Sequence, residues 1–578
     1  MDKRITIAVY IILFSFLLFL FRLWDLQVIR GAEFRKTDER NRLRVLNIPA
    51  PRGIIYDRNN KPLVKNIPSF DITVVKEDIP RDQDTLTELG RLIGLGLDDI
   101  NKRLGSPSNP FEPVTLKEDI STEEVAIIEA RKMDFPGLQI SVVSGREYIY
   151  GHSASHVLGY LGRLSLRQLR SLQYSGIPQE TPIGQFGIEK VFDETLRGKI
   201  GKKVIEVDAV GSIIKIVRIQ RPIKGRDIQL TVDIDLQVEA EKGLRGKAGA
   251  VVALQPNTGE VLALASSPTF NPNLFMRGID SKVWKGLVSN PLKPLLNRAI
   301  QSQYPPGSTF KIITAIAALE EGLVDEKTSY YCNGSIFFGR TFRCWKAAGH
   351  GDVNLHKALV ESCDVYFYEI AKQLDVDKLA QYAMGFGLGR PSDISLEGEA
   401  AGIVPTSGWK RERKNEKWFR GETLNTVIGQ GYLSTTPLQM ARLTGAVVNG
   451  GRLYEPYILA GAGAGEPESI VRIKPEYIAL IKSALLSVVS DKHGTGWAAL
   501  SDIVSIGGKT GTTQVVGGVS KSKDIPHRFK DHAWFVAFAP ENSPQIAVAV
   551  FVEHGEHGST GAAPIAKKII EAYFTNNG

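Results

Sequence analysis

Ser308 and Lys311 are the residues whose types and spacing best fit covalent chemistry in this chain. They open the apolar run Ile312 to Leu319, directly after the turn sequence Pro305-Pro306-Gly307. Residues three apart on a helix share one face, so the lysine amine can take the proton of the serine hydroxyl, which is a poor nucleophile without a base. The turn would begin the helix near Ser308, where free backbone N–H groups stabilise negative charge. We therefore expect an activated serine.

Two later segments supply the partners that such a serine needs. Ser362-Cys363-Asp364 comes first, and Lys509-Thr510-Gly511-Thr512 follows before an apolar strand. The order Ser-x-x-Lys, Ser-x-Asn-like and Lys-Thr-Gly is the signature of active-site serine penicilloyl transferases. The chain repeats Ser-x-x-Lys at Ser212 to Lys215 and at Ser520 to Lys523, but neither copy opens an apolar helical run. We expect both copies to be surface coincidences.

The N-terminal segment has the composition of a membrane anchor. Ile5 to Phe21 is uncharged and mostly apolar, and Trp24 supplies an interfacial aromatic ring. A cleavable signal peptide is the alternative, but no small-residue cleavage site follows the run. Lys3 and Arg4 precede it and suggest a cytoplasmic N-terminus, but Arg22, Arg30, Arg35 and Lys36 follow it, so the charges alone do not decide the orientation. We expect residues 1–24 to form a retained single-pass anchor. The chemistry implied by the family resemblance places it in the cytoplasmic (inner) membrane, with the bulk of the chain on the extracytoplasmic, periplasmic side.

The formal net charge of +8 does not indicate a nucleic-acid partner. The basic residues are dispersed and no nucleic-acid-binding motif accompanies them. The densest basic cluster, Lys410 to Arg420, is interleaved with Glu412 and Glu416. We expect a solvated loop or helix face there, and contact with an anionic polymer or with lipid head groups is the alternative.

The rest of the chain divides near residue 225. Residues 25–225 alternate short strands, helices and turns without a nucleophile or metal constellation, which predicts a non-catalytic pedestal domain. Residues 226–578 predict an α/β (α+β) domain, in which helices flank an antiparallel sheet whose first and last strands meet. The expected elements are strands at Ile228 to Val232, Ala248 to Leu254, Val261 to Ala265, Ala533 to Ala539 and Gln545 to Val552, and a last helix near Ala562 to Tyr573.

The chain resembles the class B penicillin-binding proteins, most closely their elongation-specific branch. The resemblance covers most of the length and is carried by Arg52 to Asn59, Gly187 to Gly201, Thr258 to Asn273, Asn297 to Lys311, Ile428 to Tyr432, Thr436 to Gln439 and Ala563 to Ala566. It implies one transmembrane helix, a dimerisation-type pedestal and a penicillin-binding transpeptidase domain. It also implies crosslinking of peptidoglycan stem peptides through an acyl-enzyme, without a catalytic cofactor, and inhibition by β-lactam antibiotics.

The resemblance further implies two protein partners: a membrane-embedded glycan polymerase of the shape-elongation-division-sporulation family and rod-shape scaffold proteins. A role mainly as an interaction subunit of that polymerase is therefore an alternative to catalysis. A β-lactam hydrolase is a second alternative, because Glu422-Thr423-Leu424-Asn425 is one residue short of the glutamate loop of serine β-lactamases. We expect that likeness to be a coincidence.

The resemblance assigns roles to the first two motifs. Ser308 would attack the carbonyl between two D-alanines, and Lys311 would accept its proton if burial or a second cation such as Lys509 lowers the pKa of the amine. Ser362 would relay protons to the leaving amine. Asp364 stands where asparagine is commonest, and its carboxylate offers the substrate no N–H. It is either protonated, or orients Lys311, or leaves that contact to another group.

The third motif would bind the donor peptide. Lys509 and Thr510 would hold its terminal carboxylate, and Gly511 would let the strand approach the substrate closely. The backbone N–H groups of Ser308 and Thr512 would form the oxyanion hole, worth about 3 kcal/mol per donor.

All three cysteines, Cys332, Cys344 and Cys363, fall in one short stretch together with His350. An extracytoplasmic location favours a Cys332–Cys344 disulfide, which leaves Cys363 unpaired. A closed zinc site formed by all four side chains would instead staple this stretch to the segment that carries Ser362. Free thiols are the third possibility, since the spacing is not that of a standard zinc finger.

Overall fold

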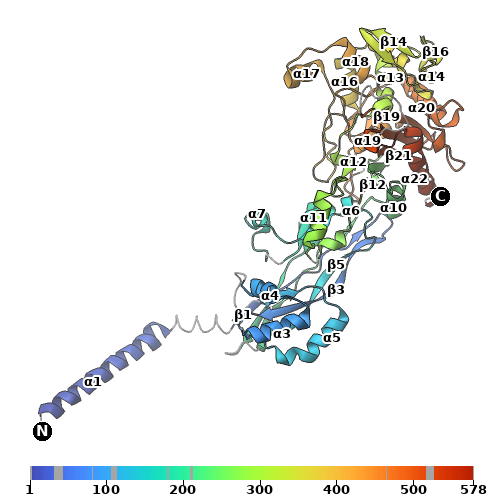
Figure 1. The fold of residues 1–578 in the computed structure, drawn as a ribbon. Helices are drawn as coiled ribbons and strands as arrows, with labels where there is room; N and C mark the ends of the chain where they lie inside the picture. The colour runs from blue at the N-terminus through green and yellow to red at the C-terminus, as the bar shows by residue number, and fades with distance from the viewer. Residues whose placement is uncertain are drawn as a thin grey trace. The chain divides into compact units, whose positions relative to one another are not determined.

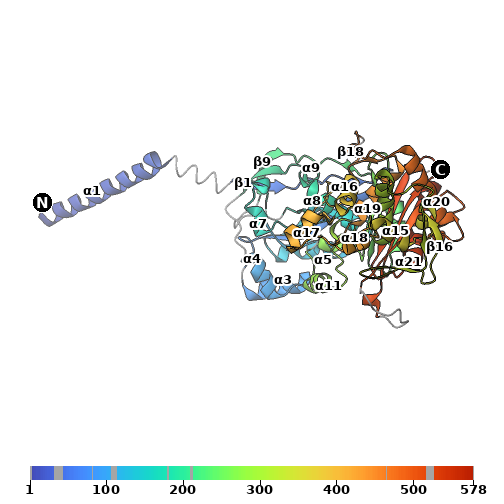
Figure 2. The same cartoon turned by 90° about the horizontal axis from the view of Figure 1, so that it is seen from above.

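The computed structural model describes residues 3–31, 43–80, 82–105, 113–178, 181–207, 213–276, 278–463, 465–515 and 526–576. Ser212 and the segment Ser520 to Lys523 lie outside these residues. The chain forms two compact units, each made of several pieces (Figure 1 and Figure 2). The smaller unit contains residues 1–53, 66–145 and 197–226, and the larger contains residues 54–65, 146–196 and 227–578.

The described chain begins with a long apolar helix, α1 (Lys3–Trp24), which continues as a short π-helical turn to Ile29. Over Lys3–Ile29 it is long and apolar enough to cross a membrane, with a mean hydropathy of 2.4 and no part of that window buried against the protein (Figure 1). Such an apolar surface is unfavourable in water and favourable in lipid. The helix therefore has the length and composition expected of the anchor.

In the smaller unit, helices cover a sheet portion formed by β3 (Pro62–Val75), β4 (Pro113–Lys117) and β5 (Leu138–Tyr148). The covering helices are α3 (Gln83–Ile93), α4 (Leu97–Leu104) and α5 (Thr122–Arg131). Ile72, Leu89 and Leu116 are fully buried in the core between them. This unit also holds a separate three-stranded antiparallel sheet in the order β1 (Leu43–Ile48), β8 (Gly201–Val207) and β9 (Ile213–Gln220).

The larger unit is built on a five-stranded antiparallel sheet. Its order is β12 (Val261–Ser267), β11 (Gly249–Leu254), β21 (Ile546–Val552), β20 (His532–Ala539) and β19 (Gly507–Thr513). Gly249 pairs with Val552, so the prediction that the first and last strands meet is confirmed. The expected strand Ile228 to Val232 is too long, because β10 spans Ile228–Gln229 and Asp233 already caps the helix α10 (Ile234–Gly243).

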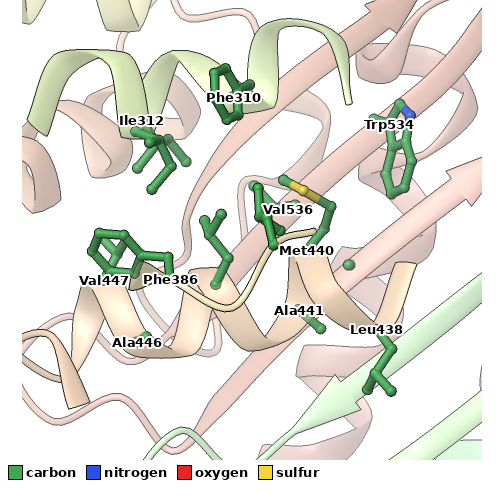
Figure 3. Close-up of a cluster of buried hydrophobic side chains, with 14 of the residues drawn as sticks. Phe310, Ile312, Phe386, Leu438, Met440, Ala441, Ala446, Val447, Trp534 and Val536 are labelled. Atoms are coloured by element: carbon green, nitrogen blue, oxygen red, sulfur yellow. The ribbon is translucent and has the colours of Figure 1, made fainter. Parts of the chain in front are cut away.

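Successive residues of these strands point to opposite faces, and helices cover both faces. On one face, Val251 and Phe535 pack with α10 and α22 (Ala563–Asn576). On the other, Val252 and Val536 belong to the core that contains α13 (Lys311–Glu320) and α19 (Pro437–Val448). Figure 3 shows Leu438, Met440 and Val447 of α19 in the same cluster as Trp534 and Val536 of β20.

Every residue of α19 is buried, so the helix is enclosed by protein on all sides. Its start is fixed by a capping box, in which the Thr436 side chain accepts from the backbone of Gln439 while the Gln439 side chain accepts from the backbone of Thr436. Phe310 and Ile312, at the start of α13, lie in the same core (Figure 3). The segment that carries Ser308 is thus anchored in the buried core of the unit.

Candidate active site

Ser308 lies in η5 (Gly307–Phe310), a 3-10 turn that leads directly into α13. Gly307 has φ +57°, and its N–H donates to the carbonyl of Gly429 at 2.9 Å. A Cβ at position 307 would lie 2.8 Å from the carbonyl oxygen of Thr512, so glycine lets the turn approach β19 this closely. The predicted helix start at Ser308 is confirmed, with a tighter first turn than an α-helix has.

Further hydrogen bonds fix the residues before Ser308. Thr513 Oγ1 and Trp534 Nε1 both donate to the carbonyl of Pro305, at 2.7 and 3.0 Å. Thr309 Oγ1 donates to the carbonyl of Pro306 at 2.7 Å. Because β19 and β20 hold the turn through these bonds, the backbone around Ser308 is set before a substrate arrives.

The Lys311 amine joins the first motif to the second. It is fully buried and donates to Asp364 Oδ1 at 2.7 Å, to the Ser362 carbonyl at 2.9 Å and to Ser362 Oγ at 3.3 Å. The amine also lies 5.4 Å from the ring centre of Phe367. Lysine, hydroxyl and carboxylate thus form one hydrogen-bonded group that can pass a proton between its members.

Ser362 and Asp364 lie at the start of α15 (Asp364–Ala371). Ser362 has φ +52°, a left-handed conformation that costs a residue with a side chain about 1 kcal/mol. Asp364 Oδ2 accepts from the backbone N–H of Trp345 at 3.0 Å. Burial raises the pKa of the Asp364 carboxyl, and the charge of Lys311 opposes that rise. These contacts fit the expectation that Asp364 orients Lys311.

The edge strand β19 contributes the third motif. Lys509 is fully buried, and its amine donates to the carbonyl of Thr510 at 3.3 Å. Burial first, and then the charge of Lys311, hold the pKa of the Lys509 amine well below its usual value, while Asp364 acts in the opposite direction. The two motif lysines are therefore close enough to influence each other.

Gly511 and Thr512 follow on the same strand. A Cβ at Gly511 would lie 2.9 Å from the carbonyl oxygen of Pro306 and 3.0 Å from Thr309 Cγ2. Only a residue without a side chain leaves room for η5 here. Thr512 is half-buried, and its carbonyl lies against Gly307. The close approach expected of Gly511 is present, and the group that approaches is the segment that carries Ser308.

Thr495 is a residue of this site that the sequence did not reveal. Its hydroxyl accepts from Thr510 Oγ1 at 2.8 Å, and its own N–H and Oγ1 reach the carbonyl of Val360 at 3.3 and 3.4 Å. Thr495 therefore connects β19 to the segment just before Ser362. The only local signal is that a glycine stands on each side of it, and many surface loops have this pattern.

Cys332, Cys344, His350 and Cys363 come together as one buried cluster. Their ligand atoms all lie within 4.8 Å of one another. The three cysteines are not joined in a disulfide, so of the three alternatives the Cys332–Cys344 bridge is the one that this structure does not contain. His350 Nδ1 lies 3.5 Å from Cys332 Sγ and 3.6 Å from Cys344 Sγ. Tetrahedral zinc with bonds of about 2.3 Å to sulfur and about 2.0 Å to nitrogen sets such atoms about 3.5 Å apart, so the four residues fit the ion.

This cluster is bonded directly to Asp364. The Asp364 backbone N–H donates to Cys344 Sγ at 3.3 Å, and the next residue along from Cys344, Trp345, donates its N–H to the Asp364 carboxylate. The Trp345 indole N–H donates to the carbonyl of Glu361 at 3.0 Å. The segment from Cys344 to Trp345 therefore also holds the carboxylate that meets Lys311.

The basic segment differs in part from its prediction. Lys410, on α17 (Ser407–Lys414), is 1% exposed rather than solvated, and its amine lies 2.6 Å from Glu422 Oε1 and 3.2 Å from Glu416 Oε2. Glu422 Oε2 accepts from the Phe419 N–H at 2.8 Å. Because both oxygens of Glu422 have structural partners, it is not poised to activate water, as a β-lactamase glutamate must be. The neighbouring basic side chains Arg411, Arg413 and Lys414 are exposed, as expected.

Comparison with known proteins gives two domain families. The penicillin binding protein transpeptidase domain matches residues 249–571, which is more than half of the chain, and the penicillin-binding protein dimerisation domain matches residues 47–230. The peptidoglycan D,D-transpeptidase MrdA of Acinetobacter baumannii is 36% identical, covering 99% of this chain and 87% of its own length. The Escherichia coli K12 protein of the same name is 33% identical, with 93% and 88% covered.

Solved structures of penicillin-binding protein 2 agree with these family matches. The complex between penicillin-binding protein PBP2 and MreC from Helicobacter pylori has a TM-score of 0.83 at 29% identity, covering 93% of this chain and 99% of that one. Pseudomonas aeruginosa PBP2 in complex with WCK 5153 has a TM-score of 0.69 at 32% identity, covering 92% and 96%. With both family domains in order behind an apolar helix, the chain belongs to the class B penicillin-binding proteins, among the relatives of penicillin-binding protein 2.

Proposed function

We propose that this peptidoglycan D,D-transpeptidase acts through Ser308 as its nucleophile. The observation that carries the proposal is the buried amine of Lys311, which bonds Ser362 and Asp364 while standing one turn from Ser308. A fully buried lysine needs a partner for its charge, and here the partners are a hydroxyl and a carboxylate that can exchange protons with it. Such a group suits acyl transfer better than it suits a purely structural role.

The proposed reaction has two steps. Ser308 Oγ attacks the carbonyl carbon between two D-alanines while Lys311 accepts the hydroxyl proton, and the N–H groups of Ser308 and Thr512 stabilise the oxyanion. The peptide C–N bond then breaks, Ser362 passes a proton to the leaving amine, and an ester remains on Ser308. An amine of a second stem peptide attacks that ester and forms the new amide bond, the C–O bond to Ser308 breaks, and the proton of the amine returns through the same group to Ser308 Oγ.

β19 supplies the proposed donor site. It is last in the order of its sheet, so a peptide can add beside it as a further strand. Lys509 and Thr510 would hold the donor carboxylate, which would offset the like charge of Lys311 and raise the pKa of Lys509 again. Thr495 would keep the Thr510 hydroxyl in position through their 2.8 Å hydrogen bond.

Intact mass after incubation with benzylpenicillin, followed by peptide mapping, tests the nucleophile. We expect one adduct, located at Ser308 and absent from Ser308→Ala. Ser520→Ala is the matched control, because Ser520 opens another Ser-x-x-Lys sequence and should keep the adduct. An adduct at another residue would refute the assignment, and rapid loss of the adduct would favour a β-lactam hydrolase.

A partner role is favoured by β9. Ile214, Ile216, Val217 and Ile219 on this edge strand are each about half exposed, between 49% and 59%. Exposed apolar edges are rare in free proteins and typical of interfaces. A solved structure described as structural coordination of polymerization and crosslinking by a peptidoglycan synthase complex aligns with the whole of this chain at a TM-score of 0.74 and 32% identity. We propose that β9 and α1 bind a glycan polymerase of the shape-elongation-division-sporulation family, and that rod-shape scaffold proteins bind the pedestal during elongation.

Reconstitution separates the two roles. Ser308→Ala should still support glycan polymerisation by the partner while crosslinking stops, because the β9 surface is unchanged. Survival of crosslinking in this variant would show that Ser308 is not the nucleophile. Loss of polymerisation would show that the catalytic and partner roles are not separable in this way.

The four-residue Cys/His cluster is proposed to hold a structural zinc ion. Zinc would supply no step of the reaction, and it would fix the loop from Cys344 to Trp345 against Asp364. Elemental analysis of the purified protein should find one zinc per chain, and Cys332→Ser should abolish it. Absence of zinc from metal-replete protein would leave the cluster as three free thiols.

The proposed organisation assigns residues 1–24 to the anchor, 25–225 to the pedestal and 226–578 to the transpeptidase domain, with both domains in the periplasm. Residues 54–65 and 146–196 of that pedestal belong to the larger compact unit. Chemistry supports that side of the membrane, since stem peptides are crosslinked outside the cytoplasm. External protease added to spheroplasts should digest a C-terminal tag. Protection of that tag would contradict this orientation.

A further inference from the structure

Beside the nucleophile segment lies a surface that the proposed reaction does not use. We name it the aromatic–basic surface, and it consists of Trp409, Arg411, Arg413, Lys414, Trp418, Phe419 and Tyr432. It is formed by α17, by α18 (Arg420–Thr426) with the loop before it, and by the segment that follows Gly429. α17 and α18 are labelled near each other in Figure 1.

Its aromatic rings are gathered around the buried Lys410. The Trp409 ring centre lies 5.3 Å from that of Tyr432, and the Trp418 ring centre lies 6.4 Å from it. The Lys410 amine lies 4.7 Å from the ring centre of Phe419, which is itself 51% exposed. Trp418 Nε1 donates to Thr423 Oγ1 at 2.9 Å. These rings are fixed in place yet half-exposed, which is unusual for side chains that serve only a core.

The charge of this surface is unbalanced. Glu416 and Glu422 both pair with Lys410, so Glu412 is the remaining carboxylate on α17, and one acid stands among three exposed cations. Within the part of the chain that the structure describes, Arg411, Arg413 and Lys414 have no carboxylate within ion-pair distance. Aromatic faces next to unpaired guanidinium and ammonium groups suit a ligand that combines sugar or peptide faces with free carboxylates.

The surface is connected to the nucleophile segment by the backbone. Gly307 N–H donates to the Gly429 carbonyl, and Tyr304 and Thr435 exchange two hydrogen bonds, each N–H to the other's carbonyl at 2.9 Å. Tyr432 therefore lies midway between two fixed points, about three residues or roughly 10 Å of chain from either. A ligand bound to these rings would need only a short extension to reach the nucleophile segment.

We propose that the aromatic–basic surface binds the acceptor strand of peptidoglycan, with the rings against its sugars and peptide and the cations on its stem-peptide carboxylates. The proposal rests on the transpeptidase function proposed above. The donor would occupy β19, which contacts Gly307 through Thr512, while the acceptor surface continues from Gly429, which contacts Gly307 through its own carbonyl. Two ligands would thus be held by different elements on either side of one turn.

The test compares full-length wild type with an Arg411→Ala, Arg413→Ala, Lys414→Ala triple variant. Removal of three exposed charge contacts should weaken binding of soluble uncrosslinked glycan strands that carry stem peptides by about tenfold. Binding of strands stripped of their peptides should change little. In crosslinking assays the KM for the acceptor strand should rise with kcat retained. A matched control, Arg245→Ala, Lys247→Ala, Lys568→Ala, removes three exposed charges elsewhere and should bind as wild type does.

Each outcome decides the proposal. Acylation of the triple variant by benzylpenicillin should be unchanged, because it needs no acceptor. Failure of acylation in wild type would refute the nucleophile, whereas normal acylation with unaltered strand binding would refute only the acceptor surface. Loss of binding to anionic phospholipid vesicles without loss of strand binding would show a membrane contact instead and would also overturn the proposal.

Discussion

The two edge strands β19 and β9 make opposite use of an unpaired backbone. β19 carries glycine, lysine and threonine, and all its residues but one are buried where η5 lies against it. β9 exposes four aliphatic side chains along its length. A free edge is a liability in either case. The side chains of an edge strand therefore select its partner, since polar groups at a buried edge suit one short peptide and aliphatic groups at an open edge suit a protein surface.

The largest effect should come from closing the space beside β19. Gly511→Ala places a Cβ 2.9 Å from the Pro306 carbonyl, so either η5 or β19 must shift. A displacement of about 1 Å at the reacting groups costs roughly 100-fold in rate, and we expect acylation by benzylpenicillin to slow by that factor. Gly286→Ala is the matched control, because nothing lies within 4 Å of its Cβ position. Equal rates in both variants would show that the close approach is unimportant.

The second largest effect on acylation at the cleft beside β19 should come from metal removal. Loss of a group that hydrogen-bonds a metal ligand typically costs 10–100-fold in metal affinity or activity. Chelation breaks the same connection from the metal side, so it should slow acylation by about tenfold as the Cys344–Trp345 loop loosens from Asp364. Zinc added back should restore the rate. Partner binding through β9 should be unaffected, and its loss on chelation would mean that the cluster supports the whole chain rather than the cleft.

The pH dependence should sharpen the role of β19 in donor binding. The lowered pKa of Lys509 means that its charge disappears at a lower pH than that of an exposed lysine. Acylation by donors with a terminal carboxylate should therefore weaken as pH rises through that lowered pKa. Arginine at position 509 keeps its charge at all these pH values, so Lys509→Arg should remove this fall in the acylation rate at high pH.

The lowered pKa of Lys509 also predicts how the free energy of unfolding changes with pH. Between the lowered pKa in the folded state and the usual lysine value of about 10.4, the unfolded chain binds more protons than the folded one. The Lys509 contribution should therefore make the protein more stable as pH rises through this interval. Denaturant unfolding of wild type and Lys509→Met at several pH values measures it, and the opposite slope in the difference would contradict the lowered pKa of the buried Lys509 amine.

The smallest effect on catalysis should come from β9. Ile216→Lys and Val217→Lys leave the larger unit untouched, so acylation should stay within about twofold of wild type, as expected for exposed substitutions. Reconstituted polymerisation with the partner should fall severalfold. Slower acylation together with normal polymerisation would reverse the comparison between the two edges.

Four of the five strands of the central sheet could be predicted because they are short continuous apolar runs, whereas β19 carries glycine, lysine and threonine. The motif residues around Ser308 could be predicted because chemistry restricts their types. Thr495 could not be predicted, since its role depends on contacts with Thr510 and Val360, which the fold brings together from distant segments. Lys410 was misjudged for a related reason: its nearest partner, Glu422, lies a full helix further along, and local charge density says nothing about burial.

Serine at position 362 holds a backbone conformation that glycine would adopt without strain. Screens that rank variants by melting temperature alone would therefore favour glycine there and would discard the hydroxyl that touches the Lys311 amine. A thermostabilised reagent obtained in that way would be a poor stand-in for the enzyme in an inhibitor campaign, because its cleft would keep its shape while lacking the route for the proton.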